Sequence, residues 1–207
     1  MRREVEQLGG AESGAELPPI SLDLRGNCLP DRFNARLASA DIFPVTEALR
    51  NDVRITSLDL GYNKIDSSGA AAVGRVIAQN SALLNINLEF NDVSTDGGKS
   101  LAEALPNCTS LRQLVLRGND IGDGAGVAVA EALNASPLEL LDVSSCDLGL
   151  RSVISVAIAA ESSDCKLSHL YLVSPLSFLS FFMSFVCCSS VVLLQFFVVE
   201  WVVILFS

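Results

Sequence analysis

Apolar residues recur along this chain with two spacings, one typical of strands and one typical of helices, in alternating stretches. In short stretches such as LDL from Leu58 and NINL from Asn85, apolar side chains alternate with others, which is typical of a strand with one buried face. The stretches that follow have helical spacing instead, as in AAAVGRVI from Ala70. The pattern therefore predicts that each unit of the chain is a strand, a turn and a helix.

This unit is repeated. Five segments fit the pattern apolar-x-x-apolar-x-apolar-x-x-Asn-x-apolar, the last with Cys for Asn: PISLDLRGNCL from Pro19, ITSLDLGYNKI from Ile55, LLNINLEFNDV from Leu83, LRQLVLRGNDI from Leu111 and LELLDVSSCDL from Leu138. A sixth begins at Leu167 and breaks off at Pro175. Starting from residue 55, the units begin 28, 28, 27 and 29 residues apart, whereas the first interval, 19 to 55, is 36 residues. Because one unit cannot bury both its apolar faces, we expect the units to stack around a continuous core.

These segments resemble leucine-rich repeats, specifically the 28-residue kind of the ribonuclease-inhibitor type, over about residues 17–172. The fifth repeat departs most, with Cys146 in the Asn position and Ser152 in the Gly position. The fold class that follows is α/β: a curved solenoid of about five repeats plus a broken sixth. Its parallel strands would line the concave side and its helices the convex side.

Composition divides the chain into three parts: a polar, acidic leader at 1–16, the solenoid at 17–172 and a hydrophobic tail at 173–207. The chain as a whole is 50% apolar and 18% charged, but the tail holds seven of the ten Phe, the only Trp and a single charged residue, Glu200. The rest of the chain carries 23 acidic and 14 basic side chains, a net charge of −9. This excess of negative charge argues against nucleic acid as a partner.

The tail is open to three interpretations. Its apolar run at 176–206 is long enough for a transmembrane helix, which would make the chain a tail-anchored protein, although no Lys or Arg follows Lys166. The second interpretation is that the tail is the translated end of a truncated or mis-spliced gene product, because its Phe, Leu, Ser, Val and Cys residues have T-rich codons. In the third interpretation, the tail folds over the open end of the solenoid as a cap.

Zinc and catalytic sites are not expected. The six Cys show no CxxC spacing, and His169 is the only histidine. The glycines from Gly122 to Gly126 lack the Lys of a phosphate-binding loop, so they indicate a flexible turn before a helix at about 123–134. Residues 1–19 have no apolar segment of a secretory signal. We therefore expect a cytoplasmic, non-enzymatic protein with free thiols and without a cofactor.

The repeated Asn is interpreted as structural. A buried amide at the bend after each strand can satisfy backbone groups that the turn leaves unpaired. Cys is a small side chain that substitutes at this position. The predicted ladder consists of Asn27, Asn63, Asn91, Asn119 and Cys146.

The side chains that face away from the core on the strands, and those just after them, form the candidate binding surface. Tyr62 and Phe90 occupy the same position in consecutive repeats, so we expect them to be neighbouring anchors on the rim. Charged side chains around them would select a partner with a basic or mixed-charge surface. A solvated acidic face without a partner is the alternative. The predicted partner-binding set is Asp59, Tyr62, Asn87, Glu89, Phe90, Val115, Arg117, Asp142 and Tyr171.

The sequence thus predicts a protein-protein interaction scaffold that binds through its concave face. The resemblance also allows a regulator of a small GTPase, similar to the activating protein for Ran, although none of that protein's functional residues can be mapped onto this chain. A tail-anchored membrane adaptor is the third hypothesis, and it depends on residues 176–206 alone. Fold alone does not choose among them.

Overall fold

The computed structural model describes residues 18–26, 36–173, 182–188 and 191–197, with side chains described up to residue 172. The predicted leader at 1–16 and the ladder residue Asn27 lie outside the described residues.

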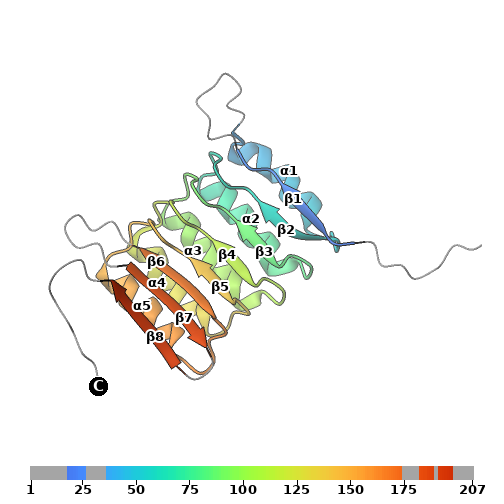
Figure 1. The fold of residues 1–207 in the computed structure, drawn as a ribbon. Helices are drawn as coiled ribbons and strands as arrows, with labels where there is room; N and C mark the ends of the chain where they lie inside the picture. The colour runs from blue at the N-terminus through green and yellow to red at the C-terminus, as the bar shows by residue number, and fades with distance from the viewer. Residues whose placement is uncertain (1–17, 27–35, 174–181, 189–190, 198–207) are drawn as a thin grey trace, which may run out of the picture.

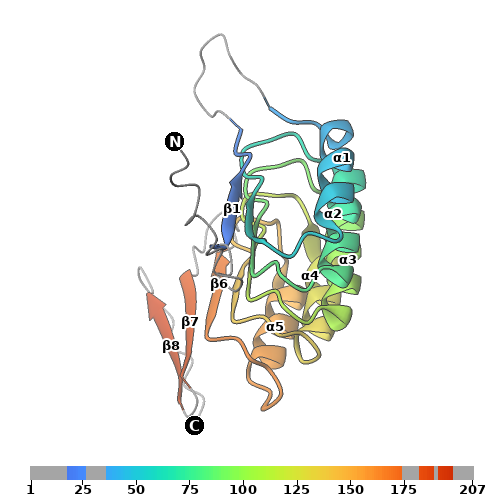
Figure 2. The same cartoon turned by 90° about the vertical axis from the view of Figure 1, so that its right-hand side faces the viewer.

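The described chain is an open sheet with helices on one face. Six strands pair in parallel in the order of the sequence: β1 (Ile20–Asp23), β2 (Ile55–Asp59), β3 (Asn85–Asn87), β4 (Gln113–Val115), β5 (Leu140–Asp142) and β6 (His169–Val173). The strands alternate with α1 (Ser39–Leu49), α2 (Ser67–Gln79), α3 (Thr95–Ala104), which leads into the short 3-10 helix η1 (Leu105–Asn107), α4 (Gly122–Leu133) and α5 (Leu150–Ala160). Figure 1 shows the strands side by side, and Figure 2 shows the helices gathered on one side of the sheet. The predicted α/β solenoid is confirmed.

The core lies between the sheet and the helices. The central apolar residue of each strand pairs in register with its equivalent in the next repeat, as Leu58 does with Ile86 and Ile86 with Leu114, and all three are buried. From the helix side, Val73 and Leu101 fill the same layer and are also buried. Stacked repeats therefore share one continuous core, which a single unit could not form.

One local prediction is corrected by α4. The helix begins at Gly122, so the glycines that follow lie inside it and do not form a turn before it. A Cβ atom on Gly126 would lie 2.5 Å from the Cβ atom of Ser152 on α5. Gly126 is thus a point of close approach between two helices. Closely spaced glycines in a sequence are compatible with either role, a flexible turn or a helix contact.

Helix α2 begins with a carboxylate cap, whose contribution to stability is expected to depend on pH. The Asp66 carboxylate accepts hydrogen bonds from the Ser68 hydroxyl (2.6 Å), the Ser39 hydroxyl (2.7 Å) and the Gly69 amide (3.2 Å). These bonds, led by that of Ser68, lower the pKa of Asp66 to about 2. Because the folded-state pKa lies below the unfolded value of about 3.9, the stabilisation is present above pH ~4 and is lost as pH falls towards 2.

Replacing Asp66 with alanine is expected to lower the free energy of unfolding by about 1 kcal/mol at neutral pH, a modest loss because solvent screens the exposed carboxylate. Urea unfolding of both proteins at several pH values would measure it. The difference should be largest above pH ~4 and shrink towards pH 2. Asp96→Ala, in the first turn of α3, is the control, and an Asp66→Ala difference independent of pH would contradict the assignment.

Beyond β6 the sheet continues with antiparallel strands. β7 (Phe182–Cys188) pairs with β6, and β8 (Val191–Phe197) pairs with β7. The structure therefore has strands within the run that one interpretation assigned to a transmembrane helix. Among the described residues, no helix has the length and apolar character needed to cross a membrane.

Helix α5 ends the helix layer of the described chain. Leu150, Ile154 and Ile158 are 69%, 48% and 66% exposed and lie four residues apart, so they form one apolar stripe. None of the described helices follows α5 along the sheet, so these side chains stay at the surface.

Candidate functional site: the strand face and its rim

The ladder residues cross-link consecutive repeats below the rim of the sheet. The Asn91 amide nitrogen donates to the carbonyls of Leu60 (2.9 Å) and Leu88 (3.0 Å), and its oxygen accepts from the Ile65 amide (3.0 Å). Asn63 and Asn119 are likewise buried and bonded to two repeats each. These three side chains hold backbone groups at the end of each strand, which keeps the rim above them in a fixed geometry.

Cys146 stands in the same place in the fifth repeat. Its thiol donates to the Leu116 carbonyl at 3.2 Å, as the amide nitrogens do, and it is fully buried. Burial raises the pKa of Cys146 to about 12, so the side chain is a protonated thiol and keeps its hydrogen for donation. Cys146 therefore holds the backbone of the bend, as the ladder amides do, and its buried, protonated thiol lacks the features of a reactive cysteine.

The register of the sheet brings one row of predicted binding residues together. Residues of this row on adjacent strands are paired in register, and their side chains lie on the face of the sheet opposite the helices. We call this face the strand face. The row reads Asp23, Asp59, Asn87, Val115, Asp142 and Tyr171. Tyr171 is 39% exposed and ends the row on β6. A row that spans six repeats offers an extended surface for a partner.

At the rim, two aromatic rings are held between two arginines. The rings of Tyr62 and Phe90 stack with centroids 4.7 Å apart and planes tilted by 35°. The Arg25 guanidinium lies 4.5 Å from the centre of the Tyr62 ring, and that of Arg117 lies 5.8 Å from the centre of the Phe90 ring. Both distances are within the range of a cation–π contact. We call Arg25, Tyr62, Phe90 and Arg117, which come from four consecutive repeats, the rim stack.

Both aromatic residues of the rim stack have strained backbones. Tyr62 has φ 57° and Phe90 has φ 50°, in the left-handed region that bulky side chains seldom adopt. In the next repeat the equivalent residue is Gly118, with φ 71°, and a Cβ atom there would lie 2.5 Å from the Phe90 ring. Phe90 thus rests directly over a residue without a side chain. The equivalent residue of the fifth repeat, Ser145, has φ 53°, so the left-handed backbone belongs to the repeated bend.

Arg25 connects the rim stack to the acidic side chains of the strand face. Its guanidinium lies 2.7 Å from a Glu89 carboxylate oxygen and 3.8 Å from one of Asp59. The predicted binding set contains both acids but omits Arg25, because nothing in the repeat pattern shows that this side chain reaches across two neighbouring repeats. The contact depends on the spatial order of the repeats.

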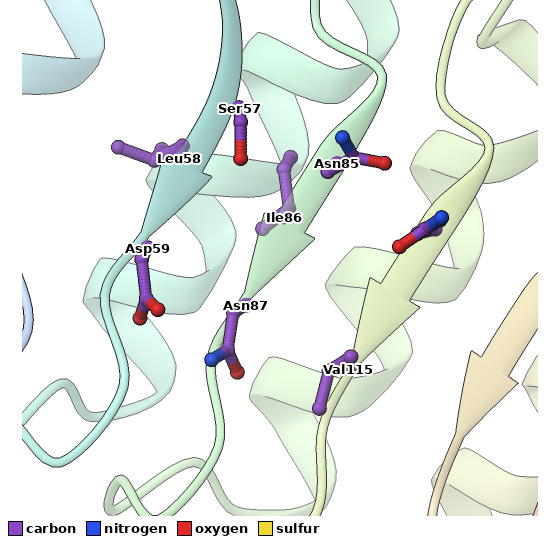
Figure 3. Close-up of a pocket in the computed structure, with 8 residues that line it drawn as sticks. Ser57, Leu58, Asp59, Asn85, Ile86, Asn87 and Val115 are labelled. Atoms are coloured by element: carbon purple, nitrogen blue, oxygen red, sulfur yellow. The ribbon is translucent and has the colours of Figure 1, made fainter. Parts of the chain in front are cut away.

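A pocket of about 280 Å³ opens on the strand face between β2, β3 and β4. Figure 3 shows Asp59 and Asn87 side by side at the ends of their strands, with Ser57 and Asn85 further back along the same strands. Gln113 and Val115 complete the wall on β4. Three of the predicted binding residues, Asp59, Asn87 and Val115, therefore line one cavity, which we call the strand pocket.

The remaining predicted residues lie apart from this centre. Asp142 lies three strands away from Asp59 and accepts a hydrogen bond from the Ser144 hydroxyl. His169 is exposed at the start of β6, where its Nδ1 atom lies 2.9 Å from the Ser168 hydroxyl. Within the part of the chain that the structure describes, no three His, Cys, Asp or Glu side chains gather in a group that could hold a metal ion.

Comparison with known families agrees with this repeated geometry. The family model described as leucine-rich repeat matches residues 55–74, 79–102 and 107–130. Three of the chain's repeats are leucine-rich repeats. The matched ranges cover strands β2 to β4 and most of helices α2 to α4, and they include the residues of the strand pocket and the two aromatic residues of the rim stack. The ribonuclease-inhibitor subtype stays a prediction.

Solved structures share the leucine-rich-repeat fold at low sequence identity. A chain titled leiomodin-1 actin-binding site 2 is 16% identical, with a TM-score of 0.53, and the match covers 67% of this chain and 77% of that one. A tropomodulin C-terminal domain from Caenorhabditis elegans is 17% identical, with a TM-score of 0.48 and coverages of 60% and 76%. No curated protein sequence matches the chain. At these identities the likeness concerns the fold alone.

Proposed function

We propose that this leucine-rich-repeat protein is an interaction scaffold that binds a protein partner through its strand face. The rim stack carries the proposal. Phe90 is 38% exposed and its ring is stacked on that of Tyr62, and burial in a core does not explain an aromatic pair kept at the surface. Aromatic and arginine side chains are also the residue types that most often anchor protein interfaces.

Preorganisation supports the same role. The rings of Tyr62 and Phe90 lie between the guanidinium groups of two arginines, and the ladder residues that follow them, Asn63 and Asn91, are buried and bonded to the backbone. Side chains that are already ordered lose little conformational entropy when a partner binds. The rim stack therefore presents two ordered aromatic rings flanked by arginines, on a surface that spans four repeats.

The charges around the rim stack suit a partner with a basic or mixed-charge surface. Asp59, Glu89 and Asp142 face the same side of the sheet as Arg25 and Arg117, which leaves the group with more negative than positive charge. Complementary charge on a partner would steer its approach and fix its orientation. The leiomodin-1 structure is titled an actin-binding site, but our proposal takes no partner from a likeness that concerns the fold alone.

Capture of partners by the immobilised full chain would test the strand face. Replacing Tyr62 and Phe90 together with serine is expected to reduce recovery of a specific partner by about tenfold or more, because it removes the two anchors. The matched control is Phe43→Ser combined with Ile158→Ser, which removes two exposed apolar side chains from the helices. Equal recovery by both double variants would contradict the proposal.

Two other hypotheses stay predictions from the sequence. Regulation of a small GTPase would require faster GTP hydrolysis when the chain is added to a candidate GTPase. A tail-anchored adaptor would require carbonate-resistant association with membranes that disappears when residues 173–207 are deleted.

A further inference from the structure

We propose that the strand pocket binds an arginine side chain of the partner. This inference rests on the proposed scaffold function and adds the chemistry of the group that the strand face recognises. The pocket spans three strands, and its volume of about 280 Å³ is large enough for one long side chain. None of the residues that line it is basic.

The lining is rich in hydrogen-bond acceptors that have no partner among the described residues. Asn85 and Gln113 are direct register partners on β3 and β4, and their side chains make no hydrogen bond to another described residue. Ser57 continues this row on β2. Each carboxamide offers a carbonyl oxygen with two lone pairs, and the hydroxyl offers another acceptor. A ligand with several donors in one plane would satisfy acceptors that come from three adjacent strands.

Asp59 gives the pocket its charge. One carboxylate oxygen accepts from the Gly61 amide at 2.9 Å, while the other lies 3.8 Å from Arg25. Arg25 is closer to Glu89, at 2.7 Å, so a single guanidinium faces two carboxylates and one negative charge remains uncompensated. The pocket is therefore suited to a cation and unsuited to a phosphate or a carboxylate.

The shape of the lining favours arginine over lysine. A guanidinium presents five N–H donors in a flat fork, which can reach Asp59, Asn85 and Gln113 at once. The aliphatic part of the side chain can lie against Val115, the apolar side chain at the end of β4. An ammonium group is a compact charge and would engage fewer of these acceptors.

Titration of the isotope-labelled full chain with a short peptide would test the pocket. The probe is acetyl-Gly-Gly-Arg-Gly-Gly-amide, followed by NMR of the side-chain amide signals of Asn85 and Gln113. We expect saturable shifts of these signals with the arginine peptide. The peptides with citrulline or lysine in place of arginine should bind about tenfold more weakly, because citrulline lacks the charge and lysine lacks the fork.

Asp59→Asn is the decisive variant, since it removes the charge but keeps the oxygen that accepts from Gly61. This variant should weaken binding of the arginine peptide about tenfold. Asp96→Asn is the matched control, because Asp96 is an exposed aspartate on α3, on the helix side of the sheet, and does not line the pocket, so it should leave affinity within about twofold. Unchanged backbone spectra establish that both variants are folded.

Four outcomes would overturn the inference: no saturation with the arginine peptide, equal binding of citrulline, equal binding of lysine, or an equal loss in both aspartate variants. Each can occur while the Tyr62 and Phe90 double variant still loses its partner, in which case the scaffold function stands and the arginine pocket fails. If the peptide binds as expected but the Tyr62/Phe90 and Phe43/Ile158 double variants recover equal amounts of the partner, the scaffold proposal fails instead.

Discussion

Replacing Asn91 with alanine is expected to lower the free energy of unfolding by about 2–4 kcal/mol, because the buried Ile65 amide loses its acceptor while the Leu60 and Leu88 carbonyls each lose one of two amide donors. In a chain of this size the loss corresponds to a fall in melting temperature of about 10 °C. Thermal and urea unfolding followed by circular dichroism would measure both quantities. The ladder would then be a main source of the stability of the bend.

Two variants sharpen this test. Asn91→Asp has nearly the same shape but only acceptor oxygens, so it should also destabilise the protein, since the Leu60 and Leu88 carbonyls each lose one of two amide donors and then face a carboxylate. Asn134→Ala removes an exposed asparagine at the end of α4 and should change stability by no more than about 0.5 kcal/mol. If Asn91→Asp proved as stable as the native chain, the donation to Leu60 and Leu88 would not hold the bend.

Replacing Gly98 with valine is expected to lower the free energy of unfolding by about 2–3 kcal/mol. A Cβ atom on Gly98 would lie 2.6 Å from the Cβ atom of Ala125 on α4, and the backbone positions of both helices are fixed by the sheet below them. The larger side chain can be accommodated only if α3 and α4 separate, which loosens the core that they cover. Urea unfolding would measure the change.

Lys99→Val is the control for this variant, because it places the same β-branched residue at the next position of the same helix, where the side chain is exposed. Lys99→Val should cost about 0.5 kcal/mol, because valine is a poorer helix former than lysine; at Gly98 valine is the better helix former, so a loss of stability there comes from the collision. A Gly98→Val protein as stable as Lys99→Val would show that α3 and α4 can move apart freely. The same reasoning applies to Gly126, which meets Ser152 between α4 and α5.

Much of the strand face follows from the repeat pattern. Equivalent residues in consecutive repeats must become neighbours in a parallel stack, so the row from Asp59 to Asp142 could be placed before the structure was known. The pairing of Tyr62 with Phe90 follows from the same rule. What these residues bind stays a prediction.

The rest of the site depends on contacts between residues that are not equivalent. Arg25 reaches Glu89 two repeats away, and Arg117 turns back over Phe90. Such contacts are decided by which rotamer each long side chain adopts in its surroundings, and no periodicity encodes that choice. The strand pocket arises in the same way, from polar side chains of different lengths on three strands.

The sequence by itself determined the repeat, the alternation of strand and helix and the face on which each side chain lies, because these depend on spacing along the chain. Only the tertiary structure decided that the rim stack forms, that Gly126 is a helix contact, and that residues 182–188 and 191–197 are strands extending the sheet. The physical reason is common to all three. Each depends on packing between groups brought together by the stack, where distances of a few tenths of an ångström decide what fits.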